Sequence, residues 1–122
     1  MGKIPFQIAR ILTAIIMLQT LYFKFSDHPD SIHIFSTLGI EPFGRYLLGT
    51  IELVASIALL VPKWTLYGAH LSMVLMFGAI GSHLFFLGIE VNNDGGILFT
   101  LALITLLGAA YTAFYKLKAV SV

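Results

Sequence analysis

Four long apolar runs determine what this chain can fold into. They cover about residues 4–25, 43–62, 65–88 and 95–116, and together they use most of the 122 residues. A helix needs about 20 mostly apolar residues to cross the hydrocarbon core of a bilayer, and the four runs meet that length. The runs are continuous rather than alternating, which disfavours a membrane β-barrel. We therefore predict an all-α integral membrane protein, a four-helix bundle forming a single domain over residues 1–122.

The composition supports this class and excludes several others. Hydrophobic residues make up 58% of the chain and charged residues only 11%, which is more apolar material than a soluble domain of this length needs. The chain has no cysteine, so this chain alone supplies no thiol nucleophile, disulfide or iron–sulfur site. The net charge of +1 offers no basic footprint for nucleic acid, and the bilayer is the expected surrounding.

The basic residues predict how the spans are oriented. Four lysines flank the ends that an even number of spans places on one side: Lys3, Lys63, Lys116 and Lys118. Lys24 and Arg45 lie near the other side, which also holds five of the six acids. The positive-inside rule then places both termini in the cytoplasm and the connections at about 26–42 and 89–94 outside.

A short amphipathic helix is expected in the first outer connection. Ile32, Phe35 and Leu38 recur at helical spacing, as in a helix that lies in the membrane interface. Asp30 or Ser31 is the expected N-cap, Gly39 can end the helix, and a proline follows it.

Small and polar residues recur at helical spacing in each run and predict which faces point into the bundle. The four stripes are Arg10, Thr13, Ala14, Met17, Thr20 and Lys24; Arg45, Gly49, Glu52 and Ser56; Gly68, Ser72, Ala79, Ser82 and His83; and Thr105, Gly108, Ala109 and Thr112. Gln19 and His70 fall away from these stripes: His70 is expected to face the interface or a partner protein, and Gln19 a partner protein or another helix.

Glu52 is the one acid inside an apolar run, where a charge is costly and is by default a functional or pairing site. Arg10 is the one base well inside a span. At about 1.5 Å rise per residue, the two differ in height by roughly 7 Å, which an arginine side chain can bridge. We predict that Arg10 and Glu52 form a core ion pair. The pair either clamps the first two helices together, or binds a ligand or handles protons; Arg10 could also extend to the interface instead.

A second group of polar residues is predicted near the outer ends of the spans. It consists of His83, Asp94, Arg45 and Lys24. A histidine beside a carboxylate can move protons near neutral pH, and such a pocket could hold a quinone headgroup or a small anion. The alternative is an interfacial histidine with Asp94 as a helix cap.

The first outer connection also contains two histidines and two aspartates, His28, His33, Asp27 and Asp30, which could bind a metal weakly. On an outward loop a solvated surface is the better interpretation, and no metal site is predicted.

Several short motifs carry a family resemblance. They are Arg10, Phe23-Lys24-Phe25, Gly49-x-x-Glu52, Leu59-Leu60-x-Pro62, Gly68-Ala69 and Ala79-x-x-x-His83. In this order and spacing they resemble the DoxX family of small membrane proteins. The stretches His28-Pro-Asp-Ser, Ile34-Phe-Ser-Thr-Leu-Gly39 and Gly88-Ile-Glu-Val-x-Asn-Asp-Gly-Gly96 resemble a DoxX-like subgroup common in Bacteroidetes.

The resemblance implies a four-helix membrane fold in which Arg10, Lys24, Glu52 and His83 are the family-like polar residues. It also suggests settings, because members are associated with a thiosulfate:quinone oxidoreductase, with oxidative-stress complexes and with handling of other membrane proteins. The leading hypothesis is an accessory or small-ligand (quinone-like) binding subunit of a redox or stress-response system, and the expected location is the inner membrane of a bacterium. The alternatives are a non-enzymatic scaffold or, with less support, a small transporter. A partner membrane or redox protein and a homo-oligomer are both compatible, and no catalytic residue is assigned.

Overall fold

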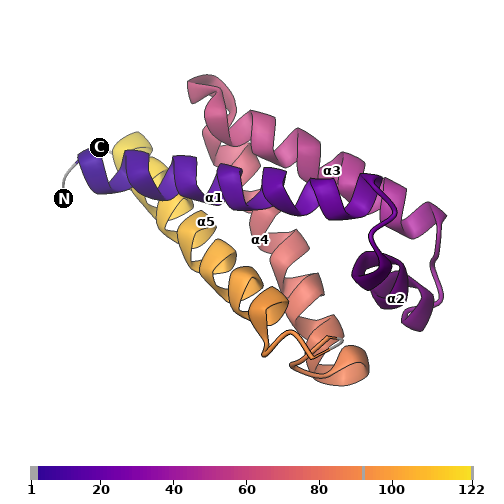
Figure 1. The fold of residues 1–122 in the computed structure, drawn as a ribbon. Helices are drawn as coiled ribbons and strands as arrows, with labels where there is room; N and C mark the ends of the chain where they lie inside the picture. Colours follow the sequence, from indigo (N-terminus) through magenta and orange to yellow (C-terminus); the bar gives the residue numbers. More distant parts are fainter. Residues whose placement is uncertain (1–2, 92, 122) are drawn as a thin grey trace.

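The computed structural model describes residues 3–91 and 93–121, the last three of them by backbone alone (Figure 1). Its helices are α1 (Lys3–Phe25), α2 (Pro29–Thr37), α3 (Phe43–Leu60), α4 (Thr65–Ser82) and α5 (Ile97–Ser121). A 3-10 turn, η1 (Pro62–Trp64), precedes α4, and a π-helical turn, η2 (His83–Leu87), follows it. The described residues contain no strand, so the all-α prediction is confirmed.

Four helical segments are long and apolar enough to cross a membrane, namely Lys3–Phe25, Phe43–Leu60, Pro62–Leu87 and Ile97–Lys118. They coincide closely with the four predicted runs. Large apolar side chains such as Ile8, Val74 and Leu107 are more than half exposed, as a lipid-facing surface requires. The chain is a multi-pass integral membrane protein.

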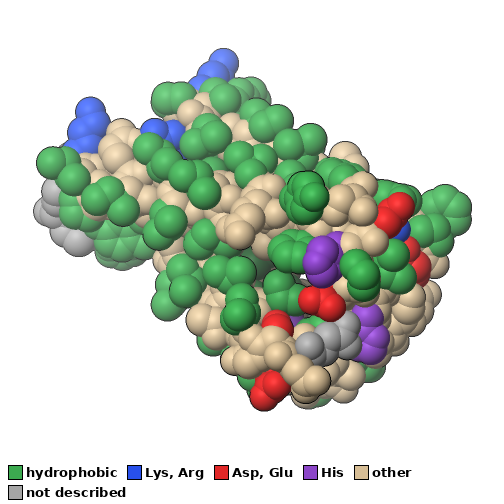
Figure 2. All heavy atoms as spheres, in the orientation of Figure 1, with side chains coloured by type: hydrophobic (Ala, Val, Ile, Leu, Met, Phe, Trp, Pro, Cys, Tyr) green, Lys and Arg blue, Asp and Glu red, His purple; other side chains and the backbone are tan. Residues whose placement is uncertain are grey.

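The long helices pack as two hairpins, α1 against α3 and α4 against α5, which also contact each other through α3 on α4 and α1 on α5. In Figure 1 the α4–α5 pair runs obliquely to the α1–α3 pair. The chain ends lie together at one end of the bundle, and α2 lies at the other. Figure 2 shows Asp, Glu and His side chains gathered at the α2 end, while most visible Lys and Arg side chains lie toward the termini.

Two glycines allow the close helix crossings. A Cβ added at Gly68 of α4 would lie 2.6 Å from the backbone nitrogen of Leu59 in α3. A Cβ added at Gly108 of α5 would lie 2.2 Å from the hydroxyl oxygen of Thr13 in α1. Small residues at such crossings are how membrane helices come close enough to gain dispersion energy.

The predicted inward faces are confirmed, because none of their members is exposed. The members that the structure buries are Thr13, Ala14, Met17, Arg45, Gly49, Glu52, Ser56, Gly68, Ser72, His83, Thr105, Ala109 and Thr112. The remaining members are half-buried: Arg10, Thr20, Lys24, Ala79, Ser82 and Gly108. Gln19 and His70 are exposed, as predicted.

The short helix α2 is present, but its N-cap differs from the prediction. His28 is the N-cap, with Nδ1 accepting from the backbone N–H of Asp30 at 3.1 Å, whereas Asp30 and Ser31 lie inside the helix. Pro29 explains this, because proline favours the first helical position and holds the residue before it extended. Gly39 follows the helix with φ +78, so its predicted ending role is confirmed.

The third predicted run, 65–88, is not one continuous α-helix. α4 ends at Ser82, and the five residues of η2 form a π turn that closes with Gly88 N–H donating to the carbonyl of His83 at 2.7 Å. Gly88 has φ +82, a conformation that glycine adopts without strain. Hydrophobic periodicity does not distinguish such a turn from an α-helix, and π turns often occur at functional sites.

Candidate functional site

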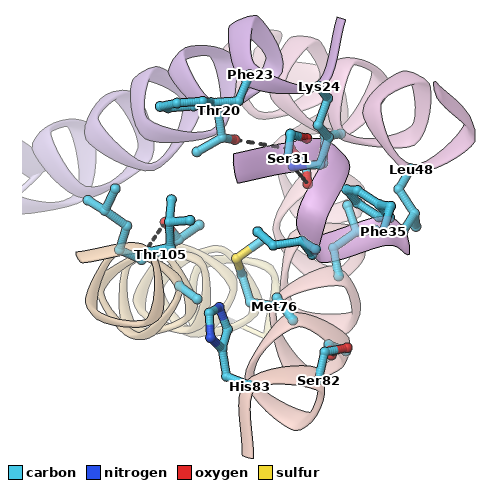
Figure 3. Close-up of a pocket in the computed structure, with 18 of the residues that line it drawn as sticks. Thr20, Phe23, Lys24, Ser31, Phe35, Leu48, Met76, Ser82, His83 and Thr105 are labelled. Carbon is cyan, nitrogen blue, oxygen red and sulfur yellow. Dashed lines mark hydrogen bonds and ion pairs between the residues drawn. The ribbon is translucent and has the colours of Figure 1, made fainter. Parts of the chain in front are cut away.

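A cavity of about 390 Å³ lies at the α2 end of the bundle, between the two hairpins (Figure 3). All five helices contribute to its wall, and Figure 2 shows a hollow in the surface between α1 and α2. Most of its lining is apolar, including Met17, Phe23, Ile34, Phe35 and Met76. Its polar lining side chains are Thr20, Lys24, Asp30, Ser31, Glu52, Ser82, His83 and Thr105. A mainly apolar cavity with a few polar groups is the usual form of a small-molecule site.

One wall of the cavity carries an ion pair. Lys24 Nζ of α1 lies 3.0 Å from Glu52 Oε1 of α3, and the two side chains are 15% and 7% exposed. The Thr20 hydroxyl lies 3.2 Å from Glu52 Oε2 and 2.8 Å from the carbonyl oxygen of Met17, and shares its proton between these acceptors. The carboxylate therefore has a partner at each oxygen, which offsets much of its desolvation cost.

The predicted Arg10–Glu52 ion pair is not formed, because Glu52 pairs with Lys24 instead. Arg10 instead donates to Gln7 Oε1 at 3.0 Å and to the carbonyl of Leu59 at 3.0 Å. The reason is side-chain direction, because helical side chains lean toward the N-terminus of their own helix. α1 and α3 are antiparallel, with Arg10 beside Leu59 and Lys24 beside Arg45. Lys24 and Glu52 therefore lean toward each other, whereas Arg10 and Glu52 lean apart.

His83 lies on another part of the wall, where the π turn begins. It is 5% exposed, and its Nδ1 lies 3.0 Å from the carbonyl oxygen of Gly88. A carbonyl only accepts, so Nδ1 carries a proton. The ring also meets Phe99 edge-on, with centroids 5.5 Å apart. The turn and α5 therefore hold the imidazole in one orientation.

Asp94 caps α5 and is not one of the cavity-lining residues. Its Oδ1 accepts from the backbone N–H groups of Gly96 at 2.8 Å and Val91 at 3.1 Å, and its Oδ2 accepts from Leu98 at 3.1 Å. Burial raises the pKa of Asp94, but these three N–H groups and the nearby His83 outweigh it and hold the pKa below its ordinary value. The cap that the sequence suggested as an alternative is the role that the contacts support.

Arg45 contacts both ends of the connection that contains α2. Its NH2 lies 2.8 Å from Glu41 Oε1 and 2.8 Å from Asp27 Oδ1, on either side of α2, and its NH1 donates to the carbonyl of Lys24. The guanidinium also lies 4.4 Å from the centroid of the Tyr46 ring. Hydrogen bonds from the Tyr46 hydroxyl and Arg45 lower the pKa of Asp27. The predicted outer group is thus divided: Lys24 and His83 line the cavity, whereas Arg45 and Asp94 hold its surrounding elements.

The described residues contain no group of three or more His, Asp or Glu side chains placed to hold a metal ion. In the connection between α1 and α3, His28 is engaged as the cap of α2 and in an edge-on contact with Phe23.

The comparison with family models identifies the family of this chain. The model of the DoxX family matches residues 6–88, which is more than half of the chain. The chain belongs to the DoxX family. The DoxX match runs from α1 through η2 and so includes Lys24, Glu52 and His83, whereas Asp94 and α5 lie beyond it. A search of curated proteins and a search of solved structures each gave no match.

Sequence reasoning missed two features of the site in this DoxX protein. It did not connect Thr20 with Glu52, although Thr20 lies one turn before Lys24 on the same stripe. It also gave α2 no part in the site, whereas Ser31, Ile34 and Phe35 of α2 form part of the cavity wall. Side-chain direction along antiparallel helices would have found Thr20 and Lys24. Nothing in the sequence of α2 itself predicts that this helix lines the cavity.

Proposed function

We propose that this DoxX-family membrane protein binds a quinone-like small molecule in the cavity, as an accessory subunit of a redox or stress-response system. The observation that carries the proposal is the buried Lys24–Glu52 pair on the wall of an otherwise apolar cavity. Two charges inside a membrane protein cost several kcal/mol to desolvate, so bundle stability alone is a weak reason to keep them. A charged pair beside a cavity suits a ligand that needs a strong hydrogen-bond donor.

A quinone headgroup fits the chemistry of this cavity. The Lys24 ammonium group has three N–H donors, and its contact with Glu52 leaves donors for a ligand oxygen. The apolar walls suit a ring and the start of a lipid tail, and about 390 Å³ lies within the usual range of small-ligand cavities. Because the cavity lies among membrane-spanning helices, its ligand would be lipophilic. The redox setting is the one that the family resemblance suggests.

The test is direct binding by the purified protein. The detergent-solubilised chain is titrated with a decyl-substituted benzoquinone by isothermal calorimetry, and a solvent extract of the purified protein is analysed for native quinone. Replacing both partners, Lys24→Met with Glu52→Leu, avoids leaving a lone buried charge. This variant should bind roughly tenfold or more weakly, as expected for loss of a charge-assisted hydrogen bond.

The matched control is Lys63→Met, which removes a lysine of the exposed turn η1, outside the cavity. It should bind like the unmodified protein. Failure of the unmodified chain to bind the benzoquinone, with no quinone in the extract, would overturn the proposal.

One observation favours a second function, that of a membrane scaffold. Gln19 is exposed on α1, where most of the other exposed residues of the span, such as Ile15 and Leu18, are apolar. A side-chain amide facing lipid is costly unless a partner helix accepts its hydrogen bonds. The scaffold function predicts that Gln19→Leu loses a co-purifying membrane protein while benzoquinone binding is unchanged. A chain that purifies alone before and after this substitution would exclude it.

A further inference from the structure

His83 supplies the cavity with an acceptor whose position is determined by the π turn. The proton on Nδ1 is directed to the carbonyl of Gly88 at 3.0 Å, so in the neutral ring Nε2 holds a lone pair. Nε2 has no hydrogen-bond partner among the described residues. Every fully buried side-chain nitrogen and oxygen there is bonded, so Nε2 must be accessible. His83 lines the cavity, and Figure 3 shows its ring pointing into it.

The donor and the acceptor lie on different walls. Figure 3 shows Lys24 and Thr20 on the α1 side and His83 on the α4 side, with apolar side chains such as Met76 between them. A matching ligand needs an oxygen that accepts at one end and a hydroxyl that donates at the other, separated by an apolar body. A fatty acid has its polar atoms at one end and would engage Lys24 alone.

We propose that the cavity recognises the hydroquinone, the reduced dihydroxy form of its ligand, in preference to the quinone. One hydroxyl donates to His83 Nε2, and the oxygen of the opposite hydroxyl accepts from Lys24. A quinone has two acceptor oxygens, so its second oxygen would face the His83 lone pair without a proton between them. This inference rests on the proposed function and deepens it, because it makes His83 the residue that distinguishes the two forms of the ligand.

The experiment compares the two forms on the same protein. The detergent-solubilised chain is titrated under argon at pH 8.0 with decyl-substituted benzoquinone and separately with its hydroquinone. We expect the hydroquinone to bind about tenfold more tightly, the effect of one hydrogen bond to the acceptor that His83 presents to the cavity. His83→Phe should weaken hydroquinone binding about tenfold and leave quinone binding within about twofold.

The matched control is His70→Phe, at an exposed residue of α4, the helix that leads into η2, and it should leave both affinities unchanged. Equal binding of the two forms by the unmodified chain, or tighter binding of the quinone, would overturn the inference while the proposed function stands. A preference that survives His83→Phe would overturn the role of His83. Binding of neither form would remove the proposed function as well. The comparison on the unmodified chain needs no variant, so it decides even where His83→Phe does not fold.

Discussion

Lys24 of α1 and Glu52 of α3 meet at 3.0 Å because their antiparallel helices direct both side chains into the same layer of the bundle. With Thr20 at the second carboxylate oxygen, the pair is partnered on its buried side and open to a cavity on the other. This buried charge pair therefore lies where a ligand in the cavity could also contact it.

Breaking this ion pair on one side should be costly. Glu52→Leu leaves a mostly buried ammonium group unpaired, and we expect a loss of about 3 kcal/mol in the free energy of unfolding. Adding Lys24→Met removes the second charge and should recover most of that loss. Thermal unfolding in detergent, followed by circular dichroism, measures both. Glu90→Gln, at an exposed acid in the 88–96 connection, is the control. A single variant as stable as the unmodified chain would show that the pair contributes nothing.

The contact between α3 and α4 should depend on Gly68. Gly68→Ala places a methyl group 2.6 Å from a backbone nitrogen that cannot yield, and we expect destabilisation of roughly 1–3 kcal/mol from overpacking. Gly78→Ala in the same helix is the matched control, since no atom lies within 4 Å of its added Cβ. Because alanine is the better helix former, the control should be neutral or slightly stabilising. Equal melting temperatures for the two variants would contradict the close crossing.

The Asp94 cap predicts a stability that depends on pH. The folded-state pKa lies below the ordinary value of 3.8, so the contribution is complete above about pH 5 and falls as pH drops through the folded-state pKa. Asp94→Asn should lower the free energy of unfolding by roughly 1 kcal/mol at neutral pH. The difference should shrink toward pH 3. Melting temperatures of both proteins measured from pH 7 to pH 3 test this, and a gap that widens in acid would have the wrong sign.

The absence of cysteine makes the predicted orientation directly testable. Ser36→Cys introduces a thiol at an exposed position on α2, and Lys63→Cys introduces one on the exposed turn η1. If both termini lie in the cytoplasm, a membrane-impermeant maleimide should label the Ser36 variant in cells whose outer envelope has been removed and whose inner membrane is sealed. The Lys63 variant should be labelled only after permeabilisation. The reverse pattern would invert the topology.

Features that depend on neighbouring residues were predictable. The lengths of the apolar runs predict the spans, and helical spacing predicts the buried faces that hold Thr13, Ser56, Ser72 and Thr112. The Gly39 ending and the Asp94 cap are likewise read within a few residues. The cap of α2 differs from the prediction because Pro29 takes the first helical position and holds His28 extended, so His28 rather than Asp30 or Ser31 becomes the N-cap.

Local sequence therefore determined that this chain is a four-span helical membrane protein and which residues face inward, because burial in a bilayer is decided by length and periodicity. Only the tertiary structure decided that Glu52 pairs with Lys24 rather than Arg10, that α2 closes a cavity, and that His83 sits on a π turn facing it. These outcomes depend on how two hairpins lie against each other and on the lean of side chains across them. Both are set by contacts between residues far apart in the chain, which local sequence patterns do not predict.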